Sequence, residues 1–316
     1  MPATLPTAVG EGRNEIPATG GLDPQGGQTP LRVGRGLGPD SLEESATSGA
    51  REDAADLDFD GLIVDLDGVV WVGASAVPGS VAAIATLRAR GIRLLFLTND
   101  PRGSRAEYAA RLRALGVPAD EGEIVTSGSA LASFVREREG VGTTAFVIGS
   151  PSLKAELGHA GLELLAREAG RAAEIVAVGG HDGFNYDELR IATQAVRGGA
   201  RLYAAGRDAT FPMPDGPWPG TGSVVAAVEV AGGKTAIAVG KPEPFIFDIA
   251  RSLLVGCRRI AIVGDNLAAD VTGGSRAGLT TILVLSGASG RDEVARAEVA
   301  PDLVLPDLAA LARTQT

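Results

Sequence analysis

The chain has 316 residues, 45% of them hydrophobic, which is enough to bury a large core in one or two domains. Its formal net charge of −10 argues against nucleic acid or an anionic membrane as a partner. The single cysteine, Cys257, excludes an intramolecular disulfide and a multi-cysteine zinc site, and it is typical of a cytoplasmic protein. No stretch approaches the roughly 20 apolar residues of a membrane span, and the N-terminus lacks the pattern of a secretory signal. An anionic substrate would therefore need a local positive site, either a lysine or a metal.

Residues 1–57 are rich in glycine, proline, serine, threonine and acidic residues, and they show little hydrophobic periodicity. Such a segment cannot bury enough apolar surface to offset the entropy lost on ordering. We therefore predict a disordered N-terminal tail over 1–57.

From Gly61 onward, predicted strands alternate with predicted helices. In chain order these are a strand over 61–66, a helix over 80–91, a strand over 92–99, a helix over 104–116, a strand over 123–127 and a helix over 129–139. Ser80 is expected to cap the first helix, and Ser104 with Glu107 has the spacing of a capping box for the second.

The alternation continues to the end of the chain. Four elements over 143–149, 152–161, 174–180 and 185–199 precede a proline- and glycine-rich loop over 211–222. After it come a helix over 223–233, a strand over 236–242, a helix over 244–256, a strand over 259–265, a helix over 268–278 and a strand over 280–287. Nearly continuous apolar strands between helices indicate an α/β fold with a parallel sheet covered on both faces.

Polar residues follow four of the predicted strands, at the sheet edge where open α/β folds bind ligands. They are Asp65 and Asp67, Thr98 and Asn99, Lys241, and Asp265 with Asp270. Each of these short sequences is by itself typical of a turn, a surface loop or a helix cap. Together they supply a nucleophile, a general acid, a hydroxyl donor, a cation and a further carboxylate pair, which favours a reaction centre.

The order of the motifs "DLDGVV", "TN", "VGKP" and "GDNLAAD" resembles the four signature motifs of the haloacid dehalogenase superfamily of phosphatases. The sequences "GFNYDELRIATQAVRGGARLYA", "PGTGS" and "VGKPEPFIFD" resemble the NagD-like and four-nitrophenylphosphatase-like branch. The resemblance covers about residues 59–311. It implies a Rossmann-like parallel-sheet core over 58–139 and 235–316, with an inserted α/β cap domain over 140–234.

The resemblance also implies Mg²⁺-dependent hydrolysis of a small phosphate monoester, of the sugar, glycerol or glycolate phosphate type. Asp65 and Asp265 would bind the metal through side chains, Asp67 through its backbone carbonyl, and Asp270 through water. Asp65 would attack phosphorus and form an aspartyl-phosphate, and Asp67 would act as general acid and then as general base. Thr98, Asn99 and Lys241 would hold the phosphoryl oxygens.

This chain departs from the pattern of the proteins it resembles in two segments. Asp100 stands where many relatives have a second asparagine, and Pro101 follows it, so the turn gains a negative charge and loses a backbone donor. We expect phosphate contact from this turn only through Asn99. Gly206 stands where relatives often have asparagine, although Asp208 is kept.

Substrate selection is expected in the cap. In relatives the loop "GGHDGFNY" faces the active site, so His181 and Asp182 are candidate substrate contacts, together with Asp208. We interpret Trp71 and Trp218 as packing residues.

Two other functions compete with phosphatase activity. A phosphosugar mutase of this superfamily usually has a small helical cap between the first two motifs, but only about 30 residues separate Asp65 from Thr98. A non-catalytic phosphometabolite-binding protein is the other alternative, and the intact set of acids and lysine argues against it. The expected partner is a small phosphorylated metabolite, and a homodimer through the cap is a candidate assembly.

Overall fold

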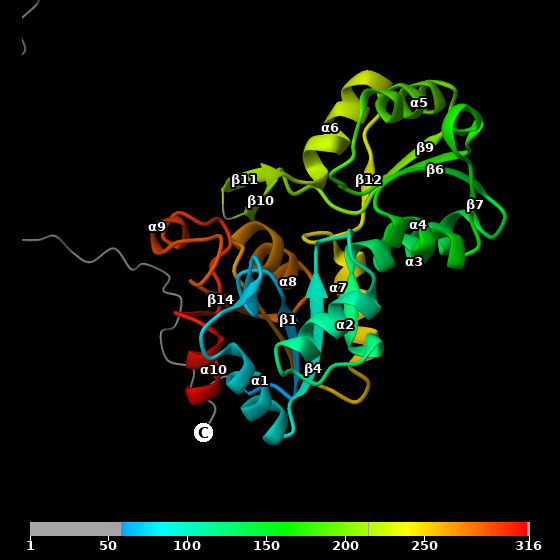
Figure 1. Ribbon diagram of the computed structural model, residues 1–316. Coiled ribbons are helices and arrows are strands. Elements are labelled where there is room, and N and C mark those ends of the chain that lie inside the picture. The colour runs from blue at the N-terminus through cyan, green and yellow to red at the C-terminus, as the bar shows by residue number, and fades with distance from the viewer. Residues whose placement is uncertain (1–57, 214, 315–316) are drawn as a thin grey trace, which may run out of the picture. The chain divides into compact units, whose positions relative to one another are not determined.

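The computed structural model describes residues 58–213 and 215–314, so the predicted tail over 1–57 lies outside the described residues. A six-stranded parallel sheet, the core sheet, has the strand order β15-β14-β13-β1-β4-β5 (Figure 1). Its strands are β1 (Gly61–Asp65), β4 (Arg93–Thr98), β5 (Ile124–Thr126), β13 (Ile260–Gly264), β14 (Thr280–Val284) and β15 (Leu303–Leu305). The α/β class with a parallel sheet is confirmed.

Helices cover both faces of the core sheet. Its central strands carry apolar side chains on both faces, and both faces must therefore be buried against other elements. All five residues of β1 are buried. Leu62 and Val64 face one apolar cluster and Ile63 faces another, as the two-residue period of a strand requires. The helices are α1 (Ser80–Ala89), α2 (Arg105–Ala114), α3 (Ser127–Glu139), α7 (Pro244–Leu253), α8 (Thr272–Arg276), α9 (Arg291–Val294) and α10 (Leu308–Thr314).

A second parallel sheet, the cap sheet, has the order β12-β9-β8-β6-β7 and lies in the chain between β5 and β13. Its strands are β6 (Thr144–Ile148), β7 (Glu163–Leu164), β8 (Ile175–Val178), β9 (Arg201–Ala204) and β12 (Ile237–Ala238). The sheet thus continues past residue 234, where the predicted cap segment ends. The strand predicted over 236–242 pairs with β9.

Helices cover both faces of the cap sheet as well. α5 (Tyr186–Arg197) and α6 (Thr221–Gly232) lie on one face, and α3 with α4 (Pro151–His159) lies on the other (Figure 1). A short 3₁₀ helix, η3 (Arg167–Ala172), packs beside α5. The cluster around α3 includes Ile63 of the core sheet and Ala145 of the cap sheet. One continuous apolar cluster therefore joins the two sheets.

The helix ends follow local rules with one exception. Ser104 and Glu107 form the predicted capping box at the start of α2. Ser80 does not cap α1 as predicted: it is the first helical residue, and the cap position is Gly79. The Ser80 hydroxyl donates to the backbone oxygen of Val70 at 3.0 Å, so this tertiary contact replaces the local one.

The segment predicted as a loop over 211–222 contains a two-stranded hairpin, β10 (Thr210–Met213) and β11 (Gly216–Pro219). Its prolines disfavour a strand assignment from sequence. They are tolerated because these strands pair only with each other in the part of the chain that the structure describes, so missing N–H groups can face outward. The segment predicted as one helix over 268–278 forms two elements. It begins as a π-helical turn, η4 (Leu267–Val271), and continues as the short helix α8.

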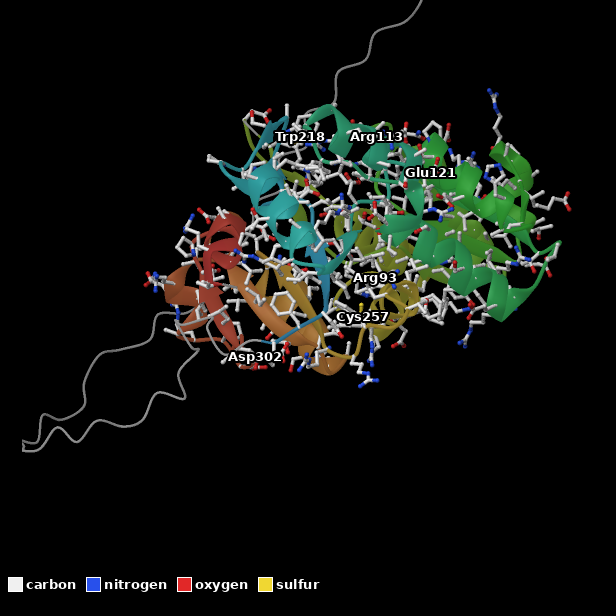
Figure 2. The ribbon with its side chains drawn as sticks, turned by 90° about the horizontal axis from the view of Figure 1, so that it is seen from below. Arg93, Arg113, Glu121, Trp218, Cys257 and Asp302 are labelled. Carbon is white, nitrogen blue, oxygen red and sulfur yellow. The ribbon has the colours of Figure 1, made fainter. Side chains whose placement is uncertain are left out.

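Cys257 lies at the end of the core sheet where its strands begin. Its sulfur contacts the backbone oxygen of Asp60, just before β1, and Arg93 at the start of β4 is its neighbour in Figure 2. The catalytic candidates lie at the opposite, carboxyl ends of these strands. Cys257 is therefore remote from them, as expected for a structural residue.

Candidate active site

The two aspartates of the first motif lie at the carboxyl end of β1. Asp65 is its last residue and is only 6% exposed. The Asp67 carboxylate accepts a hydrogen bond from Trp71 Nε1 at 2.9 Å, and the Thr98 hydroxyl lies 3.4 Å from its other oxygen. Gly68, directly after Asp67, has a positive φ of 79°, and a side chain there would overlap the Asp265 carboxylate. A glycine is thus required for the backbone to approach that acid.

Lys241 is the buried cation of the site. Its Nζ lies 2.8 Å from Asp65 Oδ1 and 2.6 Å from Asp270 Oδ1. It does not follow a strand of the core sheet, as its sequence position suggested. It follows β12 of the cap sheet, and the pairing with β9 continues through Gly240 N to Ala205 O.

Asp65, Asp265 and Asp270 form a compact buried acidic cluster. One carboxylate oxygen from each lies within 4.8 Å of the others. Three carboxylates face a single lysine, so the cluster requires further positive charge. Carboxylate oxygens are hard ligands of the kind that Mg²⁺ and Ca²⁺ prefer, and the donor set therefore fits such a cation.

The ionisation of these groups reflects burial first and neighbouring charges second. Burial raises the pKa of Asp65 well above its ordinary value. Burial, and then the charge of Asp270, raises the pKa of Asp265 to about 7. For Lys241, burial opposes ionisation, but the charges of Asp270 and Asp65 outweigh it and raise the pKa. The raised pKa values of Asp65, Asp265 and Lys241 all indicate that this acidic cluster favours added positive charge, from protons or from a bound cation.

Asp67 differs from Asp65 in its surroundings. Burial, and then the charge of Asp100, raises the pKa of Asp67, while the hydrogen bond from Trp71 opposes the shift. A carboxyl group with a raised pKa keeps its proton at higher pH, as a general acid must. Its side chain is not among the three clustered carboxylates.

The second motif places its residues between the core and the cap. Thr98 ends β4, and its hydroxyl accepts from Asp100 N at 3.0 Å. The Asn99 amide does not point freely into the site: it bonds the backbone of Lys241 and the carboxylate of Asp208, the latter at 2.8 Å. Burial raises the pKa of Asp208.

His181 and Asp182 lie on the loop after β8. His181 Nδ1 accepts from the backbone N–H of Gly183 at 3.2 Å, so Nε2 carries the proton and donates to Glu188 at 3.0 Å. The Asp182 side chain is 74% exposed and lies 3.7 Å from a nitrogen of Arg102. The loop is therefore held by His181 rather than by Asp182.

A cavity of about 730 Å³ brings the predicted residues together. All ten site residues predicted from the sequence line it: Asp65, Asp67, Thr98, Asn99, His181, Asp182, Asp208, Lys241, Asp265 and Asp270. Three aromatic side chains, Phe184, Phe211 and Trp218, also line it. Its size lies within the range of about 300–1,000 Å³ that is common for small-ligand sites.

Sequence reasoning missed three contributors. Trp71, interpreted as packing, is fully buried but also donates to Asp67. Arg102 pairs with Asp100, and the spacing of these opposite charges was the available signal. Phe211 of the hairpin lies with its ring centre 4.2 Å from the guanidinium carbon of Arg102. No sequence signal predicted that contact, because the segment was assigned to a loop.

Comparisons with known proteins agree with this fold. A family model described as haloacid dehalogenase-like hydrolase matches residues 62–163, and a second model, described as HAD-hydrolase-like, matches 238–311. The chain is 34% identical to glycerol-3-phosphate phosphatase of Gallus gallus, over 80% of this chain and 90% of the relative. It is 38% identical to chronophin of Homo sapiens, over 74% and 83%.

Solved structures show the same architecture. A glycerol phosphate phosphatase from Mycobacterium tuberculosis, crystallised with magnesium, superposes with a TM-score of 0.76 at 31% identity. The match covers 83% of this chain and 78% of that one. Fold and site define a hydrolase with a parallel-sheet core and an inserted α/β cap. The chain belongs to the haloacid dehalogenase-like hydrolases.

Proposed function

We propose that this protein is a Mg²⁺-dependent phosphatase that hydrolyses a small phosphate monoester through a phospho-aspartate on Asp65. The observation that carries the proposal is the buried Asp65 carboxylate, held 2.8 Å from Lys241 and clustered with two further acids. Relatives named glycerol-3-phosphate phosphatase, chronophin and acid sugar phosphatase support phosphate monoester hydrolysis. We expect the leaving group to be of the sugar, glycerol or glycolate type.

The metal would be held by carboxylates of the cluster. Asp65 and Asp265 each present a buried oxygen to it. Both oxygens of Asp270 already accept hydrogen bonds, from Lys241 Nζ and from the backbone N–H of Asn266, which supports a role behind the direct ligands. Bound Mg²⁺ would offset the repulsion between the nucleophile and the phosphoryl group.

The chain's own groups account for the remaining steps. An Asp65 oxygen attacks phosphorus, and the bond from phosphorus to the leaving oxygen breaks. Asp67 gives its proton to that oxygen. A water molecule then attacks the phosphorus of the aspartyl-phosphate, Asp67 takes its proton, and phosphate and free Asp65 result. Lys241 and Thr98 would hold the phosphoryl oxygens.

The segment between the first two motifs favours hydrolysis over the mutase alternative. In the fully described stretch from Asp65 to Thr98 there are only a small hairpin, β2 (Trp71–Val72) with β3 (Ser75–Ala76), and α1 before β4. A helical cap of the mutase type therefore has no counterpart there. The cap of this chain lies after the second motif instead.

Turnover of an aryl phosphate by wild type and by Asp65→Asn tests the proposal. We expect wild-type activity with Mg²⁺, loss of it in EDTA, and a fall on the order of 10³-fold or more in the variant. Asp187→Asn is the matched control, because that carboxylate is 79% exposed on α5 and does not line the cavity. Full activity in EDTA, or near-normal activity of Asp65→Asn, would contradict the mechanism.

A further inference from the structure

Asp100, the unusual acid of the second motif, is fully engaged by Arg102. Asp100 Oδ1 accepts from Arg102 Nε at 2.8 Å, and Oδ2 accepts from Nη2 at 2.9 Å. Oδ1 also accepts from the backbone N–H of Arg102 at 3.0 Å. This two-pronged arrangement is the strongest geometry available to the pair. The charge that Asp100 brings to the turn is therefore balanced within the turn.

The cap holds the other side of the same guanidinium. The ring of Phe211 lies against it, with 4.2 Å from ring centre to guanidinium carbon. Nη1 lies 3.7 Å from the carboxylate of Asp182. Arg102 is thus fixed at the meeting point of the core turn, the hairpin and the loop after β8, and it lines the active-site cavity.

No lysine or arginine among the described residues that line the cavity lacks a carboxylate partner. The lining cations are Lys241, which contacts Asp65 and Asp270, and Arg102, which contacts Asp100. The ring nitrogens of His181 are likewise occupied, by Glu188 and Gly183. Carboxylates, in contrast, recur in the lining: Asp100, Asp182 and Asp208 line the cavity in addition to Asp67 and the acidic cluster.

This charge pattern selects among phosphate esters. A leaving group with its own carboxylate or second phosphate would meet Asp182 and Asp208 without a free cation, because Asp100 occupies Arg102, and like charges in one site repel. Ionised carboxylates are hydrogen-bond acceptors, so they suit a leaving group with hydroxyl donors. The apolar wall at Phe211 and Trp218 carries no charge that could compensate a second anion.

We propose that the Asp100–Arg102 pair is a specificity determinant that makes this phosphatase discriminate against leaving groups carrying a second negative charge. Arg102 is the one arginine among the described residues that line the cavity, and its ion pair with Asp100 keeps it from binding the substrate. The inference rests on the proposed function. It narrows that function to leaving groups without a second negative charge, of the sugar and glycerol type, and excludes glycolate, which carries a carboxylate.

Two three-carbon esters test the proposal: glycerol 3-phosphate and 3-phosphoglycerate, which differ by exchange of a hydroxymethyl group for a carboxylate. For wild type with Mg²⁺, we expect kcat/KM for glycerol 3-phosphate to exceed that for 3-phosphoglycerate by about tenfold or more. Asp100→Asn keeps the oxygen that accepts from the backbone N–H and Nε of Arg102, but it removes the negative charge and the bond from Nη2, so the guanidinium is free to turn toward a substrate carboxylate. It should narrow the ratio by about tenfold, the scale of one hydrogen bond to a charged group.

The double variant Asp100→Asn/Arg102→Ala separates two causes of a narrower kcat/KM ratio: binding of the substrate carboxylate by Arg102, and loss of the Asp100 charge. If the freed guanidinium binds the substrate carboxylate, removal of Arg102 should restore the wild-type ratio. If the narrowing persisted without Arg102, loss of the Asp100 charge alone would explain it and the proposal would be overturned. The ratio should narrow because Asp100→Asn raises kcat/KM for 3-phosphoglycerate, and misfolding cannot mimic such a gain of activity.

Aryl phosphate turnover with Mg²⁺ is measured alongside in every variant. No aryl phosphatase activity in wild type would refute the proposed function itself. Aryl phosphatase activity combined with equal use of both esters by wild type, or with an unchanged ratio in Asp100→Asn, would refute only the specificity assignment.

Discussion

The side-chain amide of Asn99 forms two hydrogen bonds to the backbone of Lys241. Lys241 N–H donates to Asn99 Oδ1 at 2.8 Å, and Asn99 Nδ2 donates to Lys241 O at 2.9 Å. Asn99 itself is held by Ser127, whose hydroxyl donates to its backbone oxygen at 2.7 Å. Because Lys241 follows a strand of the cap sheet, this pairing fixes the lysine relative to Asp65 of the core sheet.

Asn99→Ala should lower kcat more than it changes KM. It leaves the Lys241 backbone groups without partners, which costs about 1–3 kcal/mol of folding free energy, and it lets the lysine shift. A displacement on the order of 1 Å can cost about 10²-fold in rate. Steady-state kinetics and thermal denaturation measure the two effects.

Ser104→Ala is the matched control for Asn99→Ala. It removes the cap of α2 and should cost about 1 kcal/mol of stability without the loss of kcat. A change of Asn99→Ala confined to KM would instead support the direct phosphate contact predicted from the sequence.

Trp71→Phe should affect esters according to their leaving group. The variant keeps an aromatic ring in a fully buried position but removes the hydrogen bond to Asp67 at 2.9 Å. Asp67 is then held less firmly as proton donor, and alkyl esters need that proton because an alkoxide leaves poorly. We expect kcat/KM to fall on the order of tenfold for glycerol 3-phosphate and much less for an aryl phosphate. Equal losses on both esters would show that Trp71 acts only through packing.

Asp265 should destabilise the metal-free protein near neutral pH. The raised pKa, about 7 against 3.8 for a free aspartate, means that the folded state binds more protons than the unfolded state between these values. The free energy of unfolding therefore falls as pH rises through this window. In EDTA, we expect Asp265→Asn to raise the melting temperature relative to wild type more at pH 7.5 than at pH 5.

Mg²⁺ provides the second arm of this experiment. A ligand that binds only the folded state raises its stability, so Mg²⁺ should raise the melting temperature of wild type at pH 7.5 more than that of Asp265→Asn. An equal shift of the variant at pH 5 and pH 7.5 would show that the Asp265 charge does not determine this stability difference.

Substitutions in the loop after β8 should change kcat/KM unequally across phosphate esters. His181→Ala removes the bonds to Glu188 and Gly183, so the loop loses its internal anchor. Asp182→Ala removes a mostly exposed carboxylate near Arg102 and should have the smaller effect. Both effects should be smallest for a generic aryl phosphate, which has no hydroxyl to bind. If both variants slowed every ester by one common factor, the loop would be a structural lid.

The sequence alone determined the α/β class, the parallel sheet and the position of the acids at its carboxyl edge. These follow from local or periodic features: the apolar run before Asp65, the alternation of strands with helices, and the capping box at Ser104 and Glu107. Such signals are readable because the physical partners lie within a few residues, or because burial of a strand leaves a continuous apolar run.

Only the tertiary structure decided how the cap completes the site. Asn99 meets Lys241 across 142 residues and Asp208 across 109, and Phe211 covers Arg102 from a segment predicted as a loop. The sequence shows that a polar side chain can donate or accept a hydrogen bond, but many residues of the chain could serve equally as its partner. Which partner it meets depends on the packing of α3 between the two sheets, and that packing is the sum of many weak apolar contacts far apart in the chain.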